Sequence, residues 1–346
     1  MKALIRSVVF NRWLRFCDKI MGSSEYSFGN IFLSYKDGLV IRATDGCLTA
    51  WMKIAECEPF YGEVQIPLRL LKGFLIGEKT EEVELTFIGD QVLLHANQET
   101  LRIKTSQPKD RERMEHFKEV GRTHLKKFVT YLDFATAALE EGDMTYIGSF
   151  DNHLVMVASS RTILSICEFD DSSFEEFHFS VPYMSSRHIV KAMKVYQKDC
   201  LLTLAIGDEK LTLLTDDFGM QICGEKSSFD SKIDQVFFEN GNPEMLYSAF
   251  AKYISKAAWL LPKDTILKIS GTDKEIKFFG TYGSVQYKAE LPMGVSKPFE
   301  VEVSPHRLRS ALARMSSRLF LIVSDRFIRI GDQKGRYVVI PFAHIR

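Results

Sequence analysis

The sequence lacks the motifs of the common enzyme and metal-binding families. It has no G-x-x-x-x-G-K-[ST] phosphate loop, no G-x-G-x-x-G, no H-E-x-x-H and no G-x-S-x-G. Its six cysteines include no C-x-x-C pair, which argues against a zinc or thioredoxin-like site. We therefore expect no cofactor, and we predict a protein that is not an enzyme.

Long apolar runs and a signal peptide are missing as well. Arg6, Arg12 and Arg15 interrupt the N-terminal segment, and no apolar run is long enough to span a bilayer. The cysteines are scattered, which is typical of small buried hydrophobic residues in a reducing compartment. We expect a cytoplasmic protein with no membrane association.

An excess of charge of one sign is also absent. The 346 residues include 45 basic and 45 acidic side chains, so the net charge is zero. The total therefore gives no indication of a nucleic-acid partner, and any such indication has to come from where the charges lie. The length suits two or three domains.

What the sequence does contain is a repeated plan. Pro67, Pro182 and Pro305 each follow a short alternating strand and precede an amphipathic helix, where the missing N–H of proline has no cost. Strand pairs with Gly-Asp or Ser-Asp turns follow each helix. Before each of these three segments the sequence predicts a further module of one helix and several strands. The helices of these modules are expected around residues 10–20, 126–141 and 244–260.

These six modules predict an α+β fold of three similar domains, each with two helices packed on antiparallel sheets. We place the domains at residues 1–118, 119–238 and 239–346. The polar segments 106–122 and 225–242 are interpreted as connections between them.

Asp45-Gly46 allows three interpretations: a catalytic acid, a metal ligand or a hairpin turn. The pair ends a Val-Ile strand, and Asp-Gly is a preferred turn pair, so we favour the turn. The same applies to Asp216 and Asp217, which could hold a divalent ion in a nucleic-acid enzyme but lie between two alternating strands. The two glycines of segment 279–283 also suit a hairpin.

Basic side chains are concentrated on five of the six expected helices. We assign Arg187, Lys191, Lys194 and Lys198 to one stripe of the helix after Pro182. We assign Arg307, Arg314 and Arg318 to the helix after Pro305. The remaining basic positions on these helices are Arg12, Arg15, Lys19, Arg69, Lys72, Lys252 and Lys256.

Two interpretations of these stripes remain open. Any soluble helix needs a solvated face, but ordinary faces mix Glu with Lys, whereas these are almost one-signed. The helix around residues 126–141 is the exception, since it carries Asp133, Glu140 and Glu141. We favour contact with nucleic-acid phosphates, which is independent of base sequence.

Several segments resemble the bacterial DNA sliding clamp, the beta subunit of DNA polymerase III. They are GNIFLSYKDGLVIRATDG (29–46), VQIPLRLLKGFL with VELTF and LRIKTS, AFAK (249–252) with LKISGTDKEIKF, and RYVVIPF (336–342). The resemblance spans nearly the whole chain. It implies a homodimeric ring that encircles double-stranded DNA without reading its sequence and serves a DNA polymerase as a processivity factor. The basic positions named above would then face the DNA.

The resemblance also implies two protein-binding surfaces. DNA polymerase and the clamp loader would bind through short peptides at Ser159, Ile163, Leu164, Val338, Val339, Ile340, Pro341 and Phe342. The dimer interface would include Leu101, Ile103, Ser255 and Lys256.

Two departures from the family leave an alternative open. The segment ASSRTIL (158–164) stands where the family usually has ATDGHRL, and the helix end near Ser255 is more polar than expected. The alternative is a protein-interaction module with the clamp fold that does not encircle DNA.

Overall fold

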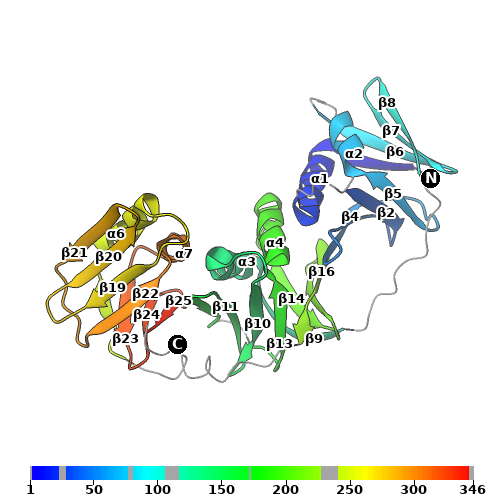
Figure 1. The fold of residues 1–346 in the computed structure, drawn as a ribbon. Coiled ribbons are helices and arrows are strands. Elements are labelled where there is room, and N and C mark those ends of the chain that lie inside the picture. The colour runs from blue at the N-terminus through cyan, green and yellow to red at the C-terminus, as the bar shows by residue number, and fades with distance from the viewer. Residues whose placement is uncertain are drawn as a thin grey trace. The chain divides into compact units, whose positions relative to one another are not determined.

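The computed structural model describes residues 2–22, 29–76, 81–105, 117–170, 173–226 and 241–342. In this part the chain forms six α-helices and antiparallel sheets, which confirms the α+β prediction (Figure 1). Two compact units result, one of residues 1–129 with 187–224, and the other of residues 130–186 with 225–346. They are called the first and second unit below. Most of the predicted connections 106–122 and 225–242 lies outside the described residues.

The first unit contains two sheets. The four-stranded sheet has the order β1-β6-β7-β8, with β1 Lys2–Arg6, β6 Glu82–Ile88, β7 Gln91–Ala96 and β8 Glu99–Lys104. The eight-stranded sheet has the order β5-β2-β3-β4-β16-β15-β14-β9. Its strands are β2 Asn30–Tyr35, β3 Leu39–Thr44, β4 Leu48–Ala55, β5 Glu63–Pro67, β9 Lys118–His124, β14 Leu201–Ile206, β15 Lys210–Leu214 and β16 Phe218–Cys223.

The second unit also contains two sheets. The nine-stranded sheet has the order β17-β13-β10-β11-β12-β25-β24-β23-β18. Its strands are β10 Met144–Phe150, β11 His153–Ser159, β12 Leu164–Glu168, β13 His178–Pro182, β17 Glu225–Lys226, β18 Glu244–Leu246, β23 Leu319–Val323, β24 Phe327–Asp332 and β25 Arg336–Pro341. The four-stranded sheet has the order β21-β20-β19-β22, with β19 Leu267–Gly271, β20 Ile276–Tyr282, β21 Val285–Leu291 and β22 Phe299–Val303.

The helices begin where the prolines predict. Pro67 and Pro182 end a strand directly before a helix, and Pro305 is the first helical residue, where the Ser304 hydroxyl accepts from the Arg307 N–H. The helices are α1 Ser7–Met21, α2 Leu68–Phe74, α3 Leu125–Ala135, α4 Tyr183–Tyr196, α6 Ser248–Leu260 and α7 Pro305–Leu312, with the 3₁₀ turn η1 Thr136–Ala138. None of these described helices is long and apolar enough to cross a membrane.

Two helix ends differ from the prediction. Gln197 adopts a φ of 60°, which ends α4 before Lys198. The helix after Pro305 ends at Leu312, so Arg314 and Arg318 follow α7 instead of lying on it. Basic stripes of the predicted length therefore do not exist on these two helices.

The predicted turns are confirmed. The Asp45 carboxylate accepts hydrogen bonds from the backbone N–H groups of Cys47 (2.9 Å) and Leu48 (2.6 Å), and from Nδ1 of His188 (2.8 Å). Burial tends to raise the pKa of Asp45, but these hydrogen bonds together hold it below its ordinary value. Asp45 thus closes the β3–β4 turn and links it to α4. The hairpin predicted at 279–283 is formed by β20 and β21.

Strand pairing joins distant parts of the chain in both units. In the first unit β4 pairs with β16, so that Ala50 lies opposite Met220. In the second unit β12 pairs with β25, so that Leu164 lies opposite Val339. Each of these two seams continues one sheet into a segment far along the sequence.

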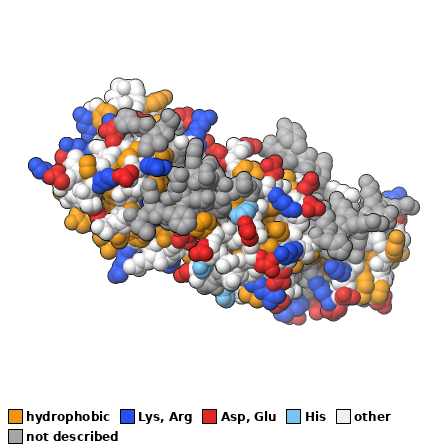
Figure 2. All heavy atoms as spheres, turned by 90° about the horizontal axis from the view of Figure 1, so that it is seen from below, with side chains coloured by type: hydrophobic (Ala, Val, Ile, Leu, Met, Phe, Trp, Pro, Cys, Tyr) orange, Lys and Arg blue, Asp and Glu red, His pale blue; other side chains and the backbone are white. Residues whose placement is uncertain are grey.

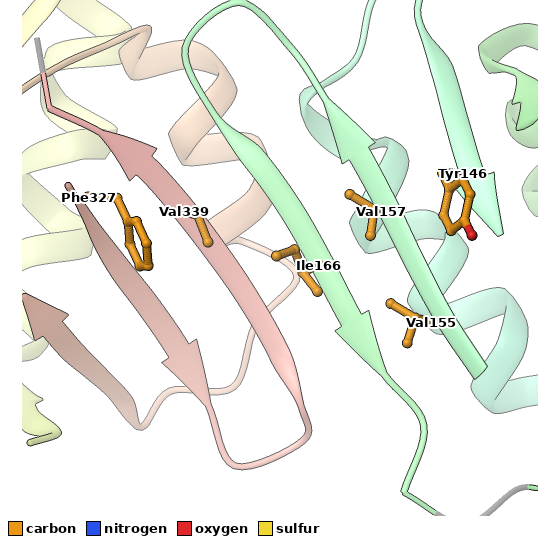
Figure 3. Close-up of a cluster of buried hydrophobic side chains, with 6 residues drawn as sticks. All are labelled: Tyr146, Val155, Val157, Ile166, Phe327 and Val339. Carbon is orange, nitrogen blue, oxygen red and sulfur yellow. The ribbon is translucent and has the colours of Figure 1, made fainter. Parts of the chain in front are cut away.

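The seam of the second unit also carries an apolar cluster. Figure 3 shows Tyr146, Val155, Val157, Ile166, Phe327 and Val339 on one face of neighbouring strands. These side chains are at most 9% exposed and come from β10, β11, β12, β24 and β25. Burial of aromatic and branched side chains on both sides of the seam stabilises the β12–β25 pairing.

A buried ion pair fastens the β24–β25 hairpin. Arg336 donates to Oδ2 of Asp332 at 2.6 Å, and the two side chains are 6% and 0% exposed. Asp332 also accepts from the backbone N–H of Ser316 at 2.8 Å. Burial tends to raise the pKa of Asp332, but Arg336 and the backbone donors hold it below its ordinary value. The pair ties the segment after α7 to the C-terminal strand.

Asp332→Asn keeps the shape of this side chain and removes its charge. We expect the free energy of unfolding at pH 7 to fall by about 3–5 kcal/mol, because a buried guanidinium loses its partner. The pKa of Asp332 is lower in the folded chain, so the pair contributes fully above a pH of about 4 and less as the pH falls through the folded-state value. Urea unfolding at pH 7 and pH 3 should therefore show a smaller difference between variant and wild type in acid.

Asp325→Asn is the matched control, since Asp325 pairs with Lys297 at the surface and is 82% exposed. Its loss should change stability far less, because exposed pairs contribute little. Equal effects of the two variants would contradict the role given to Asp332.

Candidate nucleic-acid interface

Helix α1 separates apolar from basic side chains. Trp13 and Phe16 are buried, whereas Arg12 is half-buried and Arg15 and Lys19 are exposed. Because residues three or four apart share a helix face, the three basic side chains gather on the face turned away from the core. Helix α1 thus packs into the core through its apolar face and presents its basic face at the surface.

Aromatic contacts hold α1 against α4 and β16. The ring centroids of Trp13 and Tyr196 are 5.8 Å apart, and those of Phe16 and Phe218 are 5.9 Å apart. Tyr196 meets Phe218 edge to face at 4.9 Å. These contacts fix the basic face of α1 relative to the last turns of α4, and both lie in the first unit.

A groove of about 1120 Å³ lies along this junction. It brings together five of the basic positions that the sequence analysis assigned to DNA, from three helices and the residues after α4. Its described lining includes no Asp or Glu. The lining residues are Val8, Asn11, Arg12, Leu14, Arg15, Lys72, Leu75, Ile76, Lys194, Val195, Tyr196, Gln197 and Lys198.

Carboxylates behind the groove position two of its cations. Asp18 accepts from Lys72 at 2.9 Å, which links α1 to α2. Asp217 accepts from Lys198 at 2.8 Å and from the Tyr196 hydroxyl at 2.6 Å, and these hydrogen bonds hold the pKa of Asp217 below its ordinary value. The lining still contains five cations against these two carboxylates, so the groove is positively charged in a chain of zero net charge.

The other basic positions predicted in the first unit do not line the groove. Lys19 lies 3.5 Å from Asp18, Arg69 and Lys191 are exposed, and Arg187 is half-buried. A different distribution appears on the face drawn in Figure 2, where side chains of both signs are interspersed.

In the second unit two predicted DNA-facing arginines have carboxylate partners. Arg307 lies 2.6 Å from Glu140, and Arg314 lies 3.1 Å from Asp133. Asp133 lies on α3 and Glu140 follows η1. Both belong to the stretch 126–141, which the sequence analysis expected to form the one helix without a basic face. These ion pairs connect α3 and the segment after η1 to α7 and the residues that follow it, a structural role that the charge pattern alone did not reveal.

The remaining predicted cations of the second unit are exposed. Lys252 and Lys256 lie on α6, and Arg318 lies in the segment before β23. Arg309 stacks over the Trp259 ring, 5.3 Å from its centroid.

The predicted peptide-binding residues lie around the β12–β25 seam. Ser160 closes the β11–β12 turn: its N–H donates to the Ile163 carbonyl at 2.9 Å, and its hydroxyl accepts from the Ile163 N–H at 3.3 Å. Ser160 and Arg161 stand where the resemblance implies an Asp-Gly pair, and the turn still forms.

Burial divides the predicted peptide pocket into two groups. Ile163, Val338, Val339 and Ile340 are at most 3% exposed and belong to the core. The accessible members are Ser159, Leu164, Pro341 and Phe342. Residues 343–346, which follow directly, lie outside the described residues.

The predicted dimer residues occupy two different environments. Leu101 and Ile103 lie on β8, at the edge of the four-stranded sheet, and Ile103 is only 6% exposed. The fifth helix, expected over residues 244–260, is α6: it begins only at Ser248, because residues 244–246 form β18, and it continues to Leu260, so Ser255 and Lys256 lie inside it and not at its end. Its last turn presents Trp259 and Leu260, which are 76% and 57% exposed.

The acidic and cysteine predictions have mixed outcomes. Asp217 takes part in the surface turn Thr215–Phe218, and among the described residues no group of three or more His, Cys, Asp and Glu is arranged to hold a metal ion. The prediction that cysteines are buried holds for Cys17 and Cys167, but Cys47 is exposed and the other three are half-buried.

Comparison with known proteins identifies the fold. No sequence family and no curated protein matches the chain, but solved structures do. The DNA polymerase III subunit beta from Pseudomonas aeruginosa matches with a TM-score of 0.82 at 14% identity, covering 100% of both chains. The beta subunit of Streptococcus pyogenes DNA polymerase gives 0.81 at 12% identity, covering 99% of this chain and 100% of that one.

A third match is the DNA polymerase sliding clamp from Caulobacter crescentus, with a TM-score of 0.81 at 16% identity over 100% of both chains. The resemblance inferred from short sequence segments thus extends to the whole backbone. Along its entire length, the chain has the three-domain fold of the DNA polymerase III beta-subunit sliding clamps.

Proposed function

We propose that this protein is a DNA sliding clamp, a cytoplasmic, non-catalytic processivity factor that encircles duplex DNA as a homodimer and tethers a polymerase. The observation that carries the proposal is the groove of five cations from α1, α2, α4 and the residue after it. Flexible cations on helices suit a regular array of phosphates, and such contacts permit sliding because they ignore base sequence. The clamp fold over the whole chain supports the same function.

Two unpaired sheet edges support the homodimer. In each four-stranded sheet one edge strand is bridged to another segment, β1 through Ala3 and Cys57, and β22 through Val301 and Phe342. The opposite edges, β8 and β21, have no such bridge among the described residues. Exposed strand edges pair readily, and both internal seams of the chain are made in this way.

Exposed apolar side chains lie on the helix beside one of these edges. Tyr287 of β21 donates its hydroxyl hydrogen bond to the Tyr253 carbonyl of α6, which places the edge strand beside this helix. Trp259 and Leu260 end the helix in solvent. An antiparallel pairing of β8 with β21 of a second copy would bury these side chains together with Leu101, whereas Ser255 and Lys256 would contribute little apolar area.

Polymerase and clamp-loader peptides are proposed to bind beside the β12–β25 seam. Leu164, Pro341 and Phe342 offer accessible apolar surface there, and Ser159 borders it. The four buried residues of the predicted pocket would support this surface from below instead of contacting a peptide.

The central test combines mass and topology. Light scattering should give about twice the chain mass of 39.6 kDa. A clamp loaded on nicked circular DNA should stay bound at moderate salt and leave when the DNA is cut open. A monomer that still binds polymerase peptides would instead support the alternative of an interaction module that does not encircle DNA.

Arg15→Glu with Lys194→Glu should weaken binding to duplex DNA about tenfold or more at 0.1 M salt, because two phosphate contacts become repulsive. The slope of log affinity against log salt should become shallower by about 2. Fluorescence anisotropy of a labelled duplex at several salt concentrations measures both quantities.

The control for this variant is Lys36→Glu with Lys274→Glu, two exposed lysines at hairpin turns. It changes the net charge by the same amount. If both double variants lost affinity equally, binding would follow overall charge and the groove would not be the DNA-binding surface.

Trp259→Glu should convert the dimer to a monomer at micromolar concentration, since a buried aromatic anchor would be replaced by an unpaired charge. Sedimentation equilibrium measures the change. Met245→Glu is the matched control, because Met245 is an apolar residue that is 62% exposed but lies on β18 of the nine-stranded sheet, which contributes no strand to this interface. A variant at Trp259 that remained dimeric would refute this interface.

Phe342→Ala should weaken the binding of the DNA polymerase about tenfold or more, because an accessible aromatic contact is lost. Surface plasmon resonance with immobilised clamp measures the affinity, and the dimer mass should not change. Unchanged polymerase binding would place the peptide site elsewhere.

A further inference from the structure

Two cysteines lie opposite each other at the seam of the first unit. Cys47 directly precedes β4, and Cys223 is the last residue of β16. The pairing of these strands places Ile222 opposite Leu48, and the next step of the ladder brings Cys223 opposite Cys47. The Cys223 N–H donates to the Cys47 carbonyl at 2.7 Å.

This position suits a disulfide. Opposite residues of an antiparallel hydrogen-bonded pair have Cα atoms about 5.5 Å apart and side chains on the same face. Disulfides join cysteines whose Cα atoms are about 4.4–6.8 Å apart. The Cα spacing of such a pair thus falls within the disulfide range, and a hydrogen bond between the Cys47 and Cys223 thiols shows that the two sulfur atoms are neighbours.

The two thiols already interact. Burial, and then the neighbouring Cys47 thiol, raises the pKa of the Cys223 thiol, and the Lys210 ammonium on the other side partly offsets this effect. Cys47 is exposed and Cys223 is half-buried. A dissolved oxidant can therefore reach the Cys47 thiol more easily than the Cys223 thiol, which lies next to it.

The other cysteines differ in access. Cys17 and Cys167 are buried, and burial raises the pKa of both thiols, so neither is a good nucleophile. Cys57 and Cys200 are half-buried, and burial raises the pKa of both. Cys47 is the exposed member of the six and has a second thiol beside it.

We propose that Cys47 and Cys223 form a reversible disulfide across the β4–β16 seam when the protein meets a peroxide. The Cys47 thiolate attacks one peroxide oxygen, the O–O bond breaks, and Cys47 becomes a sulfenic acid while hydroxide leaves and takes up a proton. The Cys223 thiol then attacks the Cys47 sulfur and expels the sulfenic oxygen as water. In sum two thiols and hydrogen peroxide give one disulfide and two water molecules.

The bond would add a covalent link to a junction that strand pairing, aromatic contacts and the Asp45–His188 hydrogen bond already hold. β4 belongs to the N-terminal sheet segment and β16 to a segment far along the sequence. A crosslink between distant residues restricts the unfolded chain strongly and stabilises the folded one. Oxidation would therefore make this seam resistant to opening, and a thiol reductant would restore the original state.

The experiment uses the full chain and hydrogen peroxide. The intact mass should fall by about 2 Da, the loss of two hydrogen atoms, and non-reducing peptide mapping should recover a peptide that links Cys47 to Cys223. The midpoint temperature of unfolding should rise by about 5 °C, and dithiothreitol should reverse all three changes. The Cys47→Ser and Cys223→Ser variants should show none of them.

Cys57→Ser is the matched control and should behave like the wild type. Two results would overturn the proposal: a peptide map in which Cys47 carries sulfinic or sulfonic acid while Cys223 remains a thiol, or a linked peptide that joins other cysteines. The wild-type map decides the question even if a serine variant fails to fold.

Discussion

Antiparallel pairing between strands that are distant in sequence is the interaction on which the rest of the structure depends. Two such pairings occur, β4 with β16 and β12 with β25. Each gives hydrogen-bond partners to the backbone groups of strands that would otherwise be sheet edges and would need water. The apolar cluster of Figure 3 extends on both sides of the second seam, so side-chain burial and backbone pairing reinforce each other there. The groove depends on the first seam in the same way, because Phe218 of β16 is the ring against which Phe16 and Tyr196 pack.

Local rules explain why the modules were predictable from the sequence. Proline before a helix, alternation in the strands and Asp or Ser at the turns act within a few residues of each other, and all six helices were found at their expected places. The helix end after Tyr196 was missed because the signal there is conformational: Gln197 has a positive φ, which its residue type does not indicate. The end after Leu312 carries no such signal, since Ala313 keeps a φ of −63°. Lys198, Arg314 and Arg318 were therefore placed on helices.

The seams were beyond the reach of local rules. No property of Cys47 predicts Cys223 as its neighbour, since only the register of β4 on β16 brings them together. The same holds for Arg307 and Arg314, whose spacing suggested a basic face turned toward DNA. Their partners Glu140 and Asp133 are distant in sequence, and the acidic helix that seemed to break the pattern supplies them. Basic side chains therefore have two roles here. In the first unit five of them line the groove, whereas in the second unit Arg307 and Arg314 form ion pairs with carboxylates.

The turns at Asp45 and Ser160 show what the family's Asp-Gly contributes and what it does not. Both side chains accept a backbone N–H and close a hairpin between two strands, so either residue is enough for the turn itself. Asp45 does more, because its second oxygen accepts from His188 and links the turn to α4. A hydroxyl has no second oxygen for such a link. Ser160 therefore closes its hairpin without the charged link that Asp45 makes to a neighbouring helix, so the two turns have the same backbone role but differ in charge at the surface.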